Sequence, residues 1–144
     1  IIAIGDNSIR KKIRNFVDKY KFSFANIIDP SANISDHAKI GKGNVILANS
    51  ILATGSIIKN NSIINHGAII DHDCCIGSNT HICSKVTMSG NIKIGNNVFI
   101  GLSTSIINGS NIGNNVQVGA HSFVNKSIIS NKIVYGIPAK FSDK

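Results

Sequence analysis

Large aliphatic side chains recur at every sixth position along most of the chain, and the register does not slip between Ile34 and Val124. Four residues after each of them the side chain is usually small or β-branched. A period of six fits neither an α-helix nor a plain alternating strand, but it fits a short strand followed by a corner. The aliphatic series comprises Ile34, Ile40, Ile46, Leu52, Ile58, Ile64, Ile70, Ile76, Ile82, Met88, Ile94, Ile100, Ile106, Ile112, Val118 and Val124.

Such a repeat predicts an all-β fold in which short strands wind around a triangular prism. Three hexads make one coil, so each aliphatic side chain stacks on its equivalent eighteen residues along the chain. Burial of each side chain contributes roughly 1.5–3 kcal/mol, which outweighs weak local preferences. Gly and Asn are abundant and suit the tight corners. We therefore expect a parallel β-helix of hexapeptide repeats with about five coils, stabilised by contacts between neighbouring coils.

The residues ahead of the repeat follow a different pattern. Residues 1–4 are typical of a strand, a helix is expected to run to about Tyr20, and residues 22–28 form a second extended segment. This order resembles the end of an α/β unit whose beginning is absent, which suggests a fragment of a longer chain. The candidate N-caps of the helix are Asp6, Asn7 and Ser8.

Two domains are therefore expected. Residues 1–28 are interpreted as the C-terminal remnant of a small α/β, Rossmann-like N-terminal domain. Residues 29–144 are interpreted as the β-helix, which ends in a sharp turn at residues 136–140.

The chain is basic, with 15 Lys and Arg against 7 Asp and Glu and a net charge of +8. The excess favours polyanionic ligands such as CoA phosphates or a nucleotide sugar, although it also serves general solubility. The basic residues are scattered, which argues against nucleic-acid binding. An odd set of three cysteines without a CxxC pair, no visible signal peptide and no apolar run of ~20 residues predict a cytoplasmic protein that does not insert into membranes.

The spacing of the histidines argues against a metal site. Residues eighteen apart share a face of the prism, whereas residues six apart lie on different faces, and no two histidines share a face. Zinc-binding histidines on such a scaffold would include a pair five residues apart, as in γ-type carbonic anhydrases, and no pair has that spacing. The five are His37, His66, His72, His81 and His121.

His72 is the best candidate for chemistry. It occupies a corner between Asp71 and Asp73, where side chains point outward, and a carboxylate that fixes the tautomer leaves the other ring nitrogen free to take a proton. Gly90 lies one coil further, where a bare backbone N–H can stabilise an oxyanion. The alternative is a surface histidine among polar corner residues. No Cys-His or Ser-His-Asp nucleophile is evident, which favours direct transfer.

Together these features resemble the NeuD/PglD-type bacterial acetyltransferases, which modify sialic acids or nucleotide-linked amino sugars. The resemblance covers essentially the whole chain and rests on the hexapeptide repeat and on four short segments. Arg10-Lys11-Lys12-Ile13, and Ala32 and Ile34 after Asp29-Pro30-Ser31, add to it. The left hand of the β-helix follows from the resemblance to hexapeptide transferases. The four segments are Ile4-Gly5-Asp6-Asn7, Asp71-His72-Asp73-Cys74, Met88-Ser89-Gly90-Asn91 and Gly136-Ile137-Pro138-Ala139-Lys140.

The resemblance implies a homotrimer that transfers the acetyl group of acetyl-CoA, without a metal, at sites between neighbouring β-helices. His72 would be the general base and Asp73 its orienting carboxylate, although Asp71 stays a candidate for that role. The Gly90 amide would contact the acetyl carbonyl, and His81 would lie beside the sugar acceptor, unless it is a hydrogen-bonded corner residue. CoA would lie along Gly101, Leu102, Gly119, Ala120, Pro138 and Lys140.

Two alternatives were weighed. A serine or galactoside acetyltransferase would carry a long loop within the repeat, and nothing interrupts residues 34–124. The second alternative is a non-catalytic β-helical scaffold or binding module, of which ice-binding versions would show ladders of outward Thr that are absent from the sequence. An amine and a hydroxyl acceptor both fit the sequence.

Overall fold

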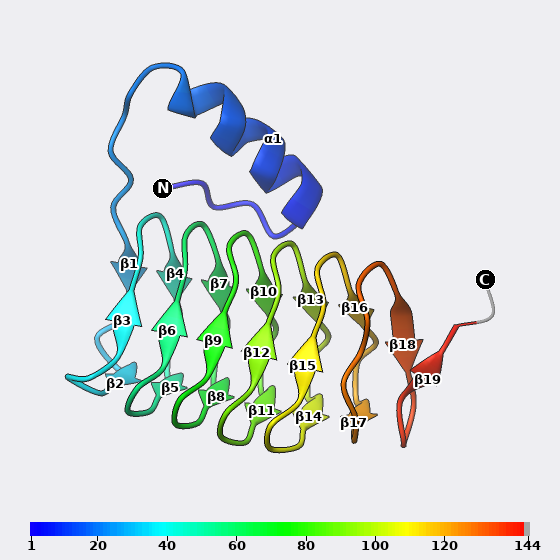
Figure 1. Cartoon of the computed structure of the whole chain (residues 1–144). Helices are drawn as coiled ribbons and strands as arrows, with labels where there is room; N and C mark the ends of the chain where they lie inside the picture. The colour runs from blue at the N-terminus through cyan, green and yellow to red at the C-terminus, as the bar shows by residue number, and fades with distance from the viewer. Residues whose placement is uncertain (143–144) are drawn as a thin grey trace.

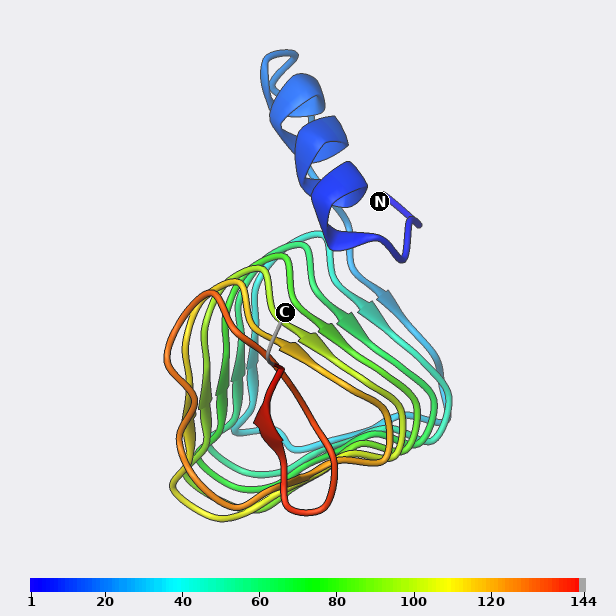
Figure 2. The same cartoon turned by 90° about the vertical axis from the view of Figure 1, so that its right-hand side faces the viewer.

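Short parallel strands form the three walls of a triangular prism, which Figures 1 and 2 show from the side and from one end. The structure is a computed structural model that describes residues 1–142, so residues 143–144 of the expected β-helix domain lie outside it. Through residue 124 each strand pairs with the strand three places away in sequence order, one coil further along, whereas the last two strands, at residues 133–135 and 140–141, depart from this order. The predicted fold class, an all-β, left-handed parallel β-helix, is confirmed.

We call the walls sheets A, B and C, and the turns between them the A–B, B–C and C–A corners. Sheet A contains β1 (Ile27–Ile28), β4 (Val45–Ile46), β7 (Ile63–Ile64), β10 (His81–Ile82), β13 (Phe99–Ile100), β16 (Gln117–Val118), β18 (Ile133–Tyr135) and β19 (Lys140–Phe141). Sheet B contains β2 (Asn33–Ile34), β5 (Ile51–Leu52), β8 (Ile69–Ile70), β11 (Thr87–Met88), β14 (Ser105–Ile106) and β17 (Phe123–Val124). Sheet C contains β3 (Lys39–Ile40), β6 (Ile57–Ile58), β9 (Cys75–Ile76), β12 (Lys93–Ile94) and β15 (Asn111–Ile112).

The second residue of nearly every strand in the repeat points into the prism. Ile64, Ile70 and Ile76, one from each wall, have no exposed surface. The first residue of a strand points outward, because successive side chains in a strand face opposite sides; Ile69 is 37% exposed. The six-residue register that predicted the core is therefore the register of the structure.

Asparagine side chains stack along the C–A corner. Their backbones have φ of 56° to 61°, a left-handed conformation that Asn tolerates better than most residues. Each amide nitrogen donates to the amide oxygen one coil further, over distances of 2.8–3.0 Å. This ladder holds the coils in register and comprises Asn61, Asn79, Asn97, Asn115 and Asn131.

The N-terminal segment differs in part from expectation. Helix α1 (Asn7–Asp18) is present, and Asp6 caps it by accepting a hydrogen bond from the Ile9 N–H at 2.8 Å. Residues 1–4 form no strand, which the sequence pattern had predicted. Of the expected segment 22–28, only β1 is a strand, and it pairs with β4. The β-helix therefore begins at Ile27, two residues ahead of the expected boundary.

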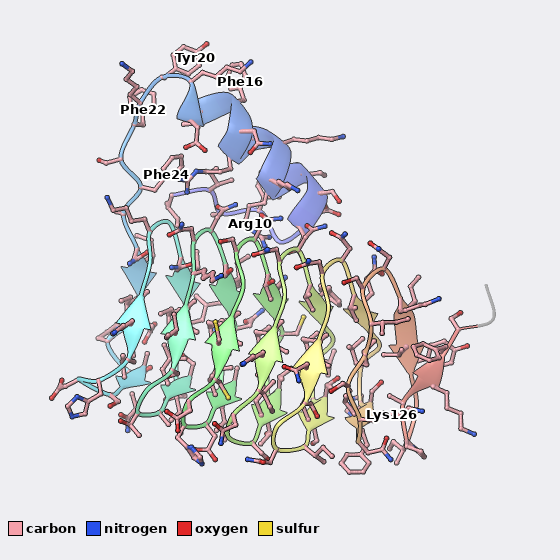
Figure 3. All side chains as sticks on the ribbon, in the orientation of Figure 1. Arg10, Phe16, Tyr20, Phe22, Phe24 and Lys126 are labelled. Carbon is pink, nitrogen blue, oxygen red and sulfur yellow. The ribbon has the colours of Figure 1, made fainter. Side chains whose placement is uncertain are left out.

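One buried arginine attaches α1 to the β-helix. Arg10 is 1% exposed, and its guanidinium donates to the carbonyls of Ile4, Gly5 and Asn61. Burial lowers its pKa to about 10. Phe16, on the helix, and Tyr20, just after its end, point away from the prism and are more than half exposed (Figure 3). The face of α1 that turns away from the prism is therefore uncovered.

Candidate active site

His72 and Asp73 form a hydrogen-bonded pair at the B–C corner, between β8 and β9. The imidazole Nδ1 lies 2.9 Å from the Asp73 carboxylate oxygen Oδ2. Because a carboxylate accepts, Nδ1 carries the proton and Nε2 keeps a free lone pair. Asp73 has φ of 57°, so its backbone adopts the left-handed conformation. The corner thus presents an oriented imidazole, 46% exposed, whose basic nitrogen is unblocked.

The two neighbouring carboxylates have different partners. Asp73 bonds the ring, whereas the Asp71 carboxylate accepts the His72 backbone N–H at 2.7 Å. The hydrogen bond with Asp73 raises the pKa of His72 above its ordinary 6.5, and the charge of Asp71 adds to the effect. Asp73 is therefore the carboxylate that orients the imidazole.

Gly90 lies against this imidazole, one coil along the same corner. A β-carbon added at Gly90 would come within 3.0 Å of three ring atoms, Nε2 among them. The Asn91 N–H donates to the His72 carbonyl at 2.9 Å, and the Asn108 amide donates to the Gly90 carbonyl at 2.9 Å. Within residues 1–142 the Gly90 N–H has no acceptor. A basic nitrogen and an uncommitted backbone donor thus meet at one corner.

His81 lies elsewhere, on the outer face of sheet A. Its Nδ1 is 3.2 Å from the Gly5 carbonyl and its Nε2 is 3.3 Å from the Asn65 amide nitrogen. Since a carbonyl only accepts and an amide nitrogen only donates, Nδ1 is protonated and both ring nitrogens are engaged. Burial lowers the pKa of His81, which favours the neutral form of the ring. Because both ring nitrogens of His81 have hydrogen-bond partners, neither is free to accept a proton from a substrate.

The residues expected along CoA form a second group at the A–B corner and the C-terminal end. Gly101 and Gly119 stack one coil apart, and a β-carbon at Gly101 would collide with the backbone at Gly119 and Ala120. Leu102 and Ala120 are exposed beside them. Pro138 and Lys140 lie at the antiparallel β18–β19 turn. This corner and the His72 corner flank opposite edges of sheet B, so one chain does not bring the two groups together.

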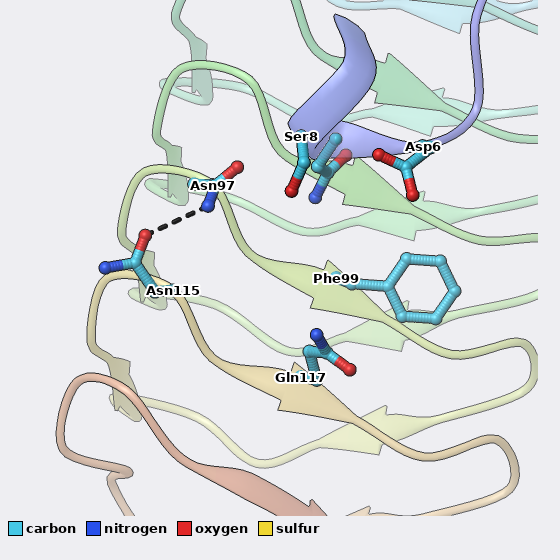
Figure 4. Close-up of a pocket in the computed structure, with 7 residues that line it drawn as sticks. Asp6, Ser8, Asn97, Phe99, Asn115 and Gln117 are labelled. Atoms are coloured by element: carbon cyan, nitrogen blue, oxygen red, sulfur yellow. Dashed lines mark hydrogen bonds between the residues drawn. The ribbon is translucent and has the colours of Figure 1, made fainter. Parts of the chain in front are cut away.

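The repeat pattern did not predict a cavity that lies between the start of α1 and sheet A. Asp6 and Ser8 line it on one side, and Phe99 and Gln117 line it on the other (Figure 4). Phe99 packs edge-on against His81, with ring centroids 5.5 Å apart. Stepping eighteen residues from His81 leads to Phe99 and then Gln117. This column of outward-facing residues, spaced eighteen apart, was the feature of the sequence that could have indicated the cavity.

Two further observations concern the described residues as a whole. In residues 1–142 no cluster of three or more His, Cys, Asp or Glu side chains is arranged to hold a metal ion. The same part of the chain contains no helix with the length and apolar character that crossing a membrane requires.

Solved structures that are similar to this chain over nearly its whole length include acetyltransferases. PerB of Caulobacter crescentus, solved with CoA and GDP-perosamine, is 33% identical, with a TM-score of 0.96 over 99% of this chain and 69% of that chain. The acetyltransferase domain of PglB of Neisseria gonorrhoeae FA1090 is 33% identical, with a TM-score of 0.95 over 97% of this chain and 68% of that chain. The PglB domain was also solved with acetyl coenzyme A.

Sequence comparison agrees over a shorter stretch. UDP-N-acetylbacillosamine N-acetyltransferase of Bacillus subtilis (strain 168) is 44% identical over 48 residues, which are 33% of this chain and 22% of that protein. No family model matches the sequence. The similarity to PerB extends over nearly the whole chain and over more than two thirds of that enzyme. The chain therefore belongs to the NeuD/PglD-type bacterial sugar acetyltransferases, hexapeptide-repeat acyltransferases whose acetyl donor is acetyl-CoA.

Proposed function

We propose that the protein transfers the acetyl group of acetyl-CoA to the amine of a nucleotide-linked amino sugar, with His72 as general base. The observation that carries this proposal is the contact between the His72 ring and Gly90, which unites a free basic nitrogen with a free backbone N–H. An amine acceptor is favoured over a hydroxyl because the named relatives include N-acetyltransferases of GDP-perosamine and of a UDP-linked amino sugar.

The reaction needs three groups of this chain. The acceptor nitrogen attacks the thioester carbon while His72 Nε2 removes its proton, and a C–N bond forms. The Gly90 N–H donates to the oxyanion that develops on the carbonyl oxygen. The C–S bond then breaks, and the imidazolium returns its proton to the CoA thiolate. Asp73 keeps Nδ1 protonated and stabilises the imidazolium throughout.

The CoA chain is proposed to lie along the A–B corner, past Gly101, Leu102, Gly119 and Ala120, with its far end near Pro138 and Lys140. Leu102 and Ala120, which are exposed on adjacent coils, and the cationic side chain of Lys140, which is exposed at the far end, support this assignment. Since these residues and His72 lie at different corners of one prism, we propose that a homotrimer assembles the complete site between neighbouring copies. The three cysteines are free, which is compatible with a cytoplasmic location.

The test is acetyl transfer by the purified protein with acetyl-CoA and a panel of GDP- and UDP-linked amino sugars, followed by release of free CoA thiol. His72→Ala is expected to lose about 10²–10⁴-fold in kcat while the oligomeric state, measured by light scattering, stays the same. His37→Ala is the matched control, because His37 is exposed at the same B–C corner two coils away. Turnover near the wild-type rate in His72→Ala would eliminate the base assignment.

A further inference from the structure

Asn108 lies one coil beyond Gly90 at the B–C corner, between β14 and β15, and the acetyl transfer proposed for His72 does not use it. Its side-chain amide nitrogen donates to the Gly90 carbonyl oxygen at 2.9 Å. The Gly109 N–H donates to the same oxygen at 3.1 Å. Because a carbonyl only accepts, the Asn108 atom that faces it is the amide nitrogen. The Gly90 carbonyl therefore has two donors from the next coil.

The bond from Gly109 is part of the regular scaffold, whereas the bond from Asn108 is not. At the corners a backbone N–H donates to a carbonyl of the preceding coil, as Asn91 does to His72. Among the corners of residues 1–142, only at Gly90 does that carbonyl also accept from a side chain of the following coil. The additional bond thus occurs at the corner that carries the imidazole and its glycine.

The peptide that carries the Gly90 N–H is held on its other side by a buried thiol. The Cys74 Sγ donates to the Ser89 carbonyl at 3.2 Å, and Cys74 is fully buried. The Ser62 hydroxyl makes the equivalent contact at the C–A corner, so this bond belongs to the scaffold. Both peptides that flank the α-carbon of Gly90 are therefore fixed, and Asn108 provides the bond that is specific to this corner.

The backbone of a glycine needs such restraint more than that of any other residue. Glycine loses the most conformational freedom on folding, so the direction of its N–H is defined only where neighbouring groups fix both dihedral angles. An oxyanion donor has to point at the developing charge before the reaction, and a small misdirection lowers the rate. Residue 90 is a glycine because the His72 imidazole occupies the place of a β-carbon. The Asn108 bond limits the freedom that this glycine introduces.

We propose that Asn108 is a positioning residue for acetyl transfer, which holds the Gly90 carbonyl and thereby directs the Gly90 N–H at the carbonyl oxygen of the thioester. This inference rests on the proposed function. Asn108 acts through Gly90 and binds neither substrate. A neutral amide suits this role, because a carboxylate at the same place would repel both the Gly90 carbonyl and the developing oxyanion.

The first test compares Asn108→Ala with Asn125→Ala in steady-state kinetics with acetyl-CoA and an amino-sugar acceptor. Asn125 is the matched control, because it is an exposed asparagine of the same corner whose side chain has no hydrogen-bond partner in the part of the chain that the structure describes. Asn108→Ala should lower kcat at least about fivefold, as loss of one hydrogen bond to the donor peptide implies. Both KM values should stay within twofold, since the bond acts only on a transition-state donor.

Asn108 is exposed, so the thermal midpoint of Asn108→Ala should change little. Asn125→Ala should match the wild type in kcat and in both KM values. A kcat of Asn108→Ala within about twofold of the wild type would overturn the inference. A loss confined to the KM of either substrate would also overturn it, because Asn108 would then bind that substrate instead of positioning Gly90.

The second test separates an effect on the oxyanion donor from an effect on the base. Asn108→Ala should leave the acid limb of kcat/KM at the wild-type pH, because the pair of His72 and Asp73 is unchanged. Asn108→Asp has the same size but lacks the donor and adds a negative charge, so its kcat should fall further than that of Asn108→Ala. A shifted acid limb in Asn108→Ala, or wild-type kcat in Asn108→Asp, would contradict the proposal.

The third test repeats Asn108→Ala in a Gly90→Ala background. Once the new methyl group shields the N–H, loss of the Asn108 bond should lower kcat by less than about twofold more. Fully additive losses would show that Asn108 acts independently of Gly90 and would overturn the inference. A wild-type protein that acetylates no amino sugar would instead refute the proposed function.

Discussion

The imidazole of His72 rests on the bare α-carbon of Gly90, so closely that a β-carbon there would overlap three of the ring atoms. The residues are eighteen apart, which is one coil of the prism. Their contact explains why a glycine stands at this corner although its backbone does not have positive φ. The relationship leads directly to the first prediction.

Gly90→Ala is expected to lower kcat by about 10²-fold or more, because the new methyl group displaces the imidazole and shields the backbone N–H that stabilises the oxyanion. The thermal midpoint should change little, since the ring is exposed. A double-mutant cycle with His72→Ala checks the cause. Once the ring is absent, Gly90→Ala should cost much less than it does alone, and fully additive losses would contradict the contact.

Asp73→Asn is expected to move the pH dependence of kcat/KM. The hydrogen bond with Asp73 raises the pKa of His72, and a general base works only when unprotonated, so wild-type activity should fall as the pH drops through an apparent pKa above 6.5. Without the carboxylate this acid limb should shift to lower pH, while the plateau at high pH falls by at least about tenfold as the tautomer is lost. Asn retains the left-handed backbone that residue 73 adopts.

Asp71→Asn is the comparison for that profile. The Asp71 carboxylate accepts a hydrogen bond from the His72 backbone N–H and acts on the ring only through its charge. The acid limb in the pH profile of Asp71→Asn should therefore shift less than that of Asp73→Asn. A larger shift for Asp71→Asn than for Asp73→Asn would reverse the assignment of the orienting carboxylate.

Ile76→Ala is expected to reduce the free energy of unfolding by about 2–5 kcal/mol, because the side chain is fully buried between Ile58 and Ile94 of the neighbouring coils. Cys75→Ala, in the same strand but pointing outward, should change it by less than about 0.5 kcal/mol. Denaturant unfolding of both variants measures the difference. Equal losses would mean that the aliphatic column does not form the core.

Arg10→Met is expected to loosen the N-terminal segment without unfolding the β-helix. The substitution removes every hydrogen bond of the guanidinium and leaves the carbonyls of Ile4, Gly5 and Asn61 without that donor. Limited proteolysis should then cut residues 19–26 at least about fivefold faster, while the thermal midpoint of the β-helix changes little. Lys11→Met, which changes an exposed residue of the same helix, is the control. In this variant residues 19–26 should be cut no faster than in the wild type.

Much of the site was accessible from spacing alone. Because each coil takes eighteen residues, the sequence placed His72 beside Gly90. The expectation that no two histidines share a face was wrong for His37, which lies at the same B–C corner as His72. It also located the helix and limited its cap to Asp6, Asn7 or Ser8, of which Asp6 is the cap in the structure. The expected strand at residues 1–4 was wrong, because an apolar run forms a strand only where a partner strand is available, and none pairs with it within residues 1–142.

Other features depended on which groups meet across the prism. The resemblance favoured Asp73 and left Asp71 open, and the left-handed backbone of Asp73 turns its carboxylate onto the ring. Likewise, His81 became a residue with both nitrogens engaged because Gly5 and Asn65, distant in the sequence, reach it. The cavity over Phe99 exists because Arg10 anchors α1 beside sheet A.

The strict six-residue spacing of the aliphatic side chains thus determined the fold, the core and the stacking of residues one coil apart, since a periodic chain repeats its local geometry. The tertiary structure alone decided which carboxylate orients the imidazole and which side chains surround the cavity. Those contacts join a non-repeating segment to the prism, or depend on side-chain directions that a period does not specify.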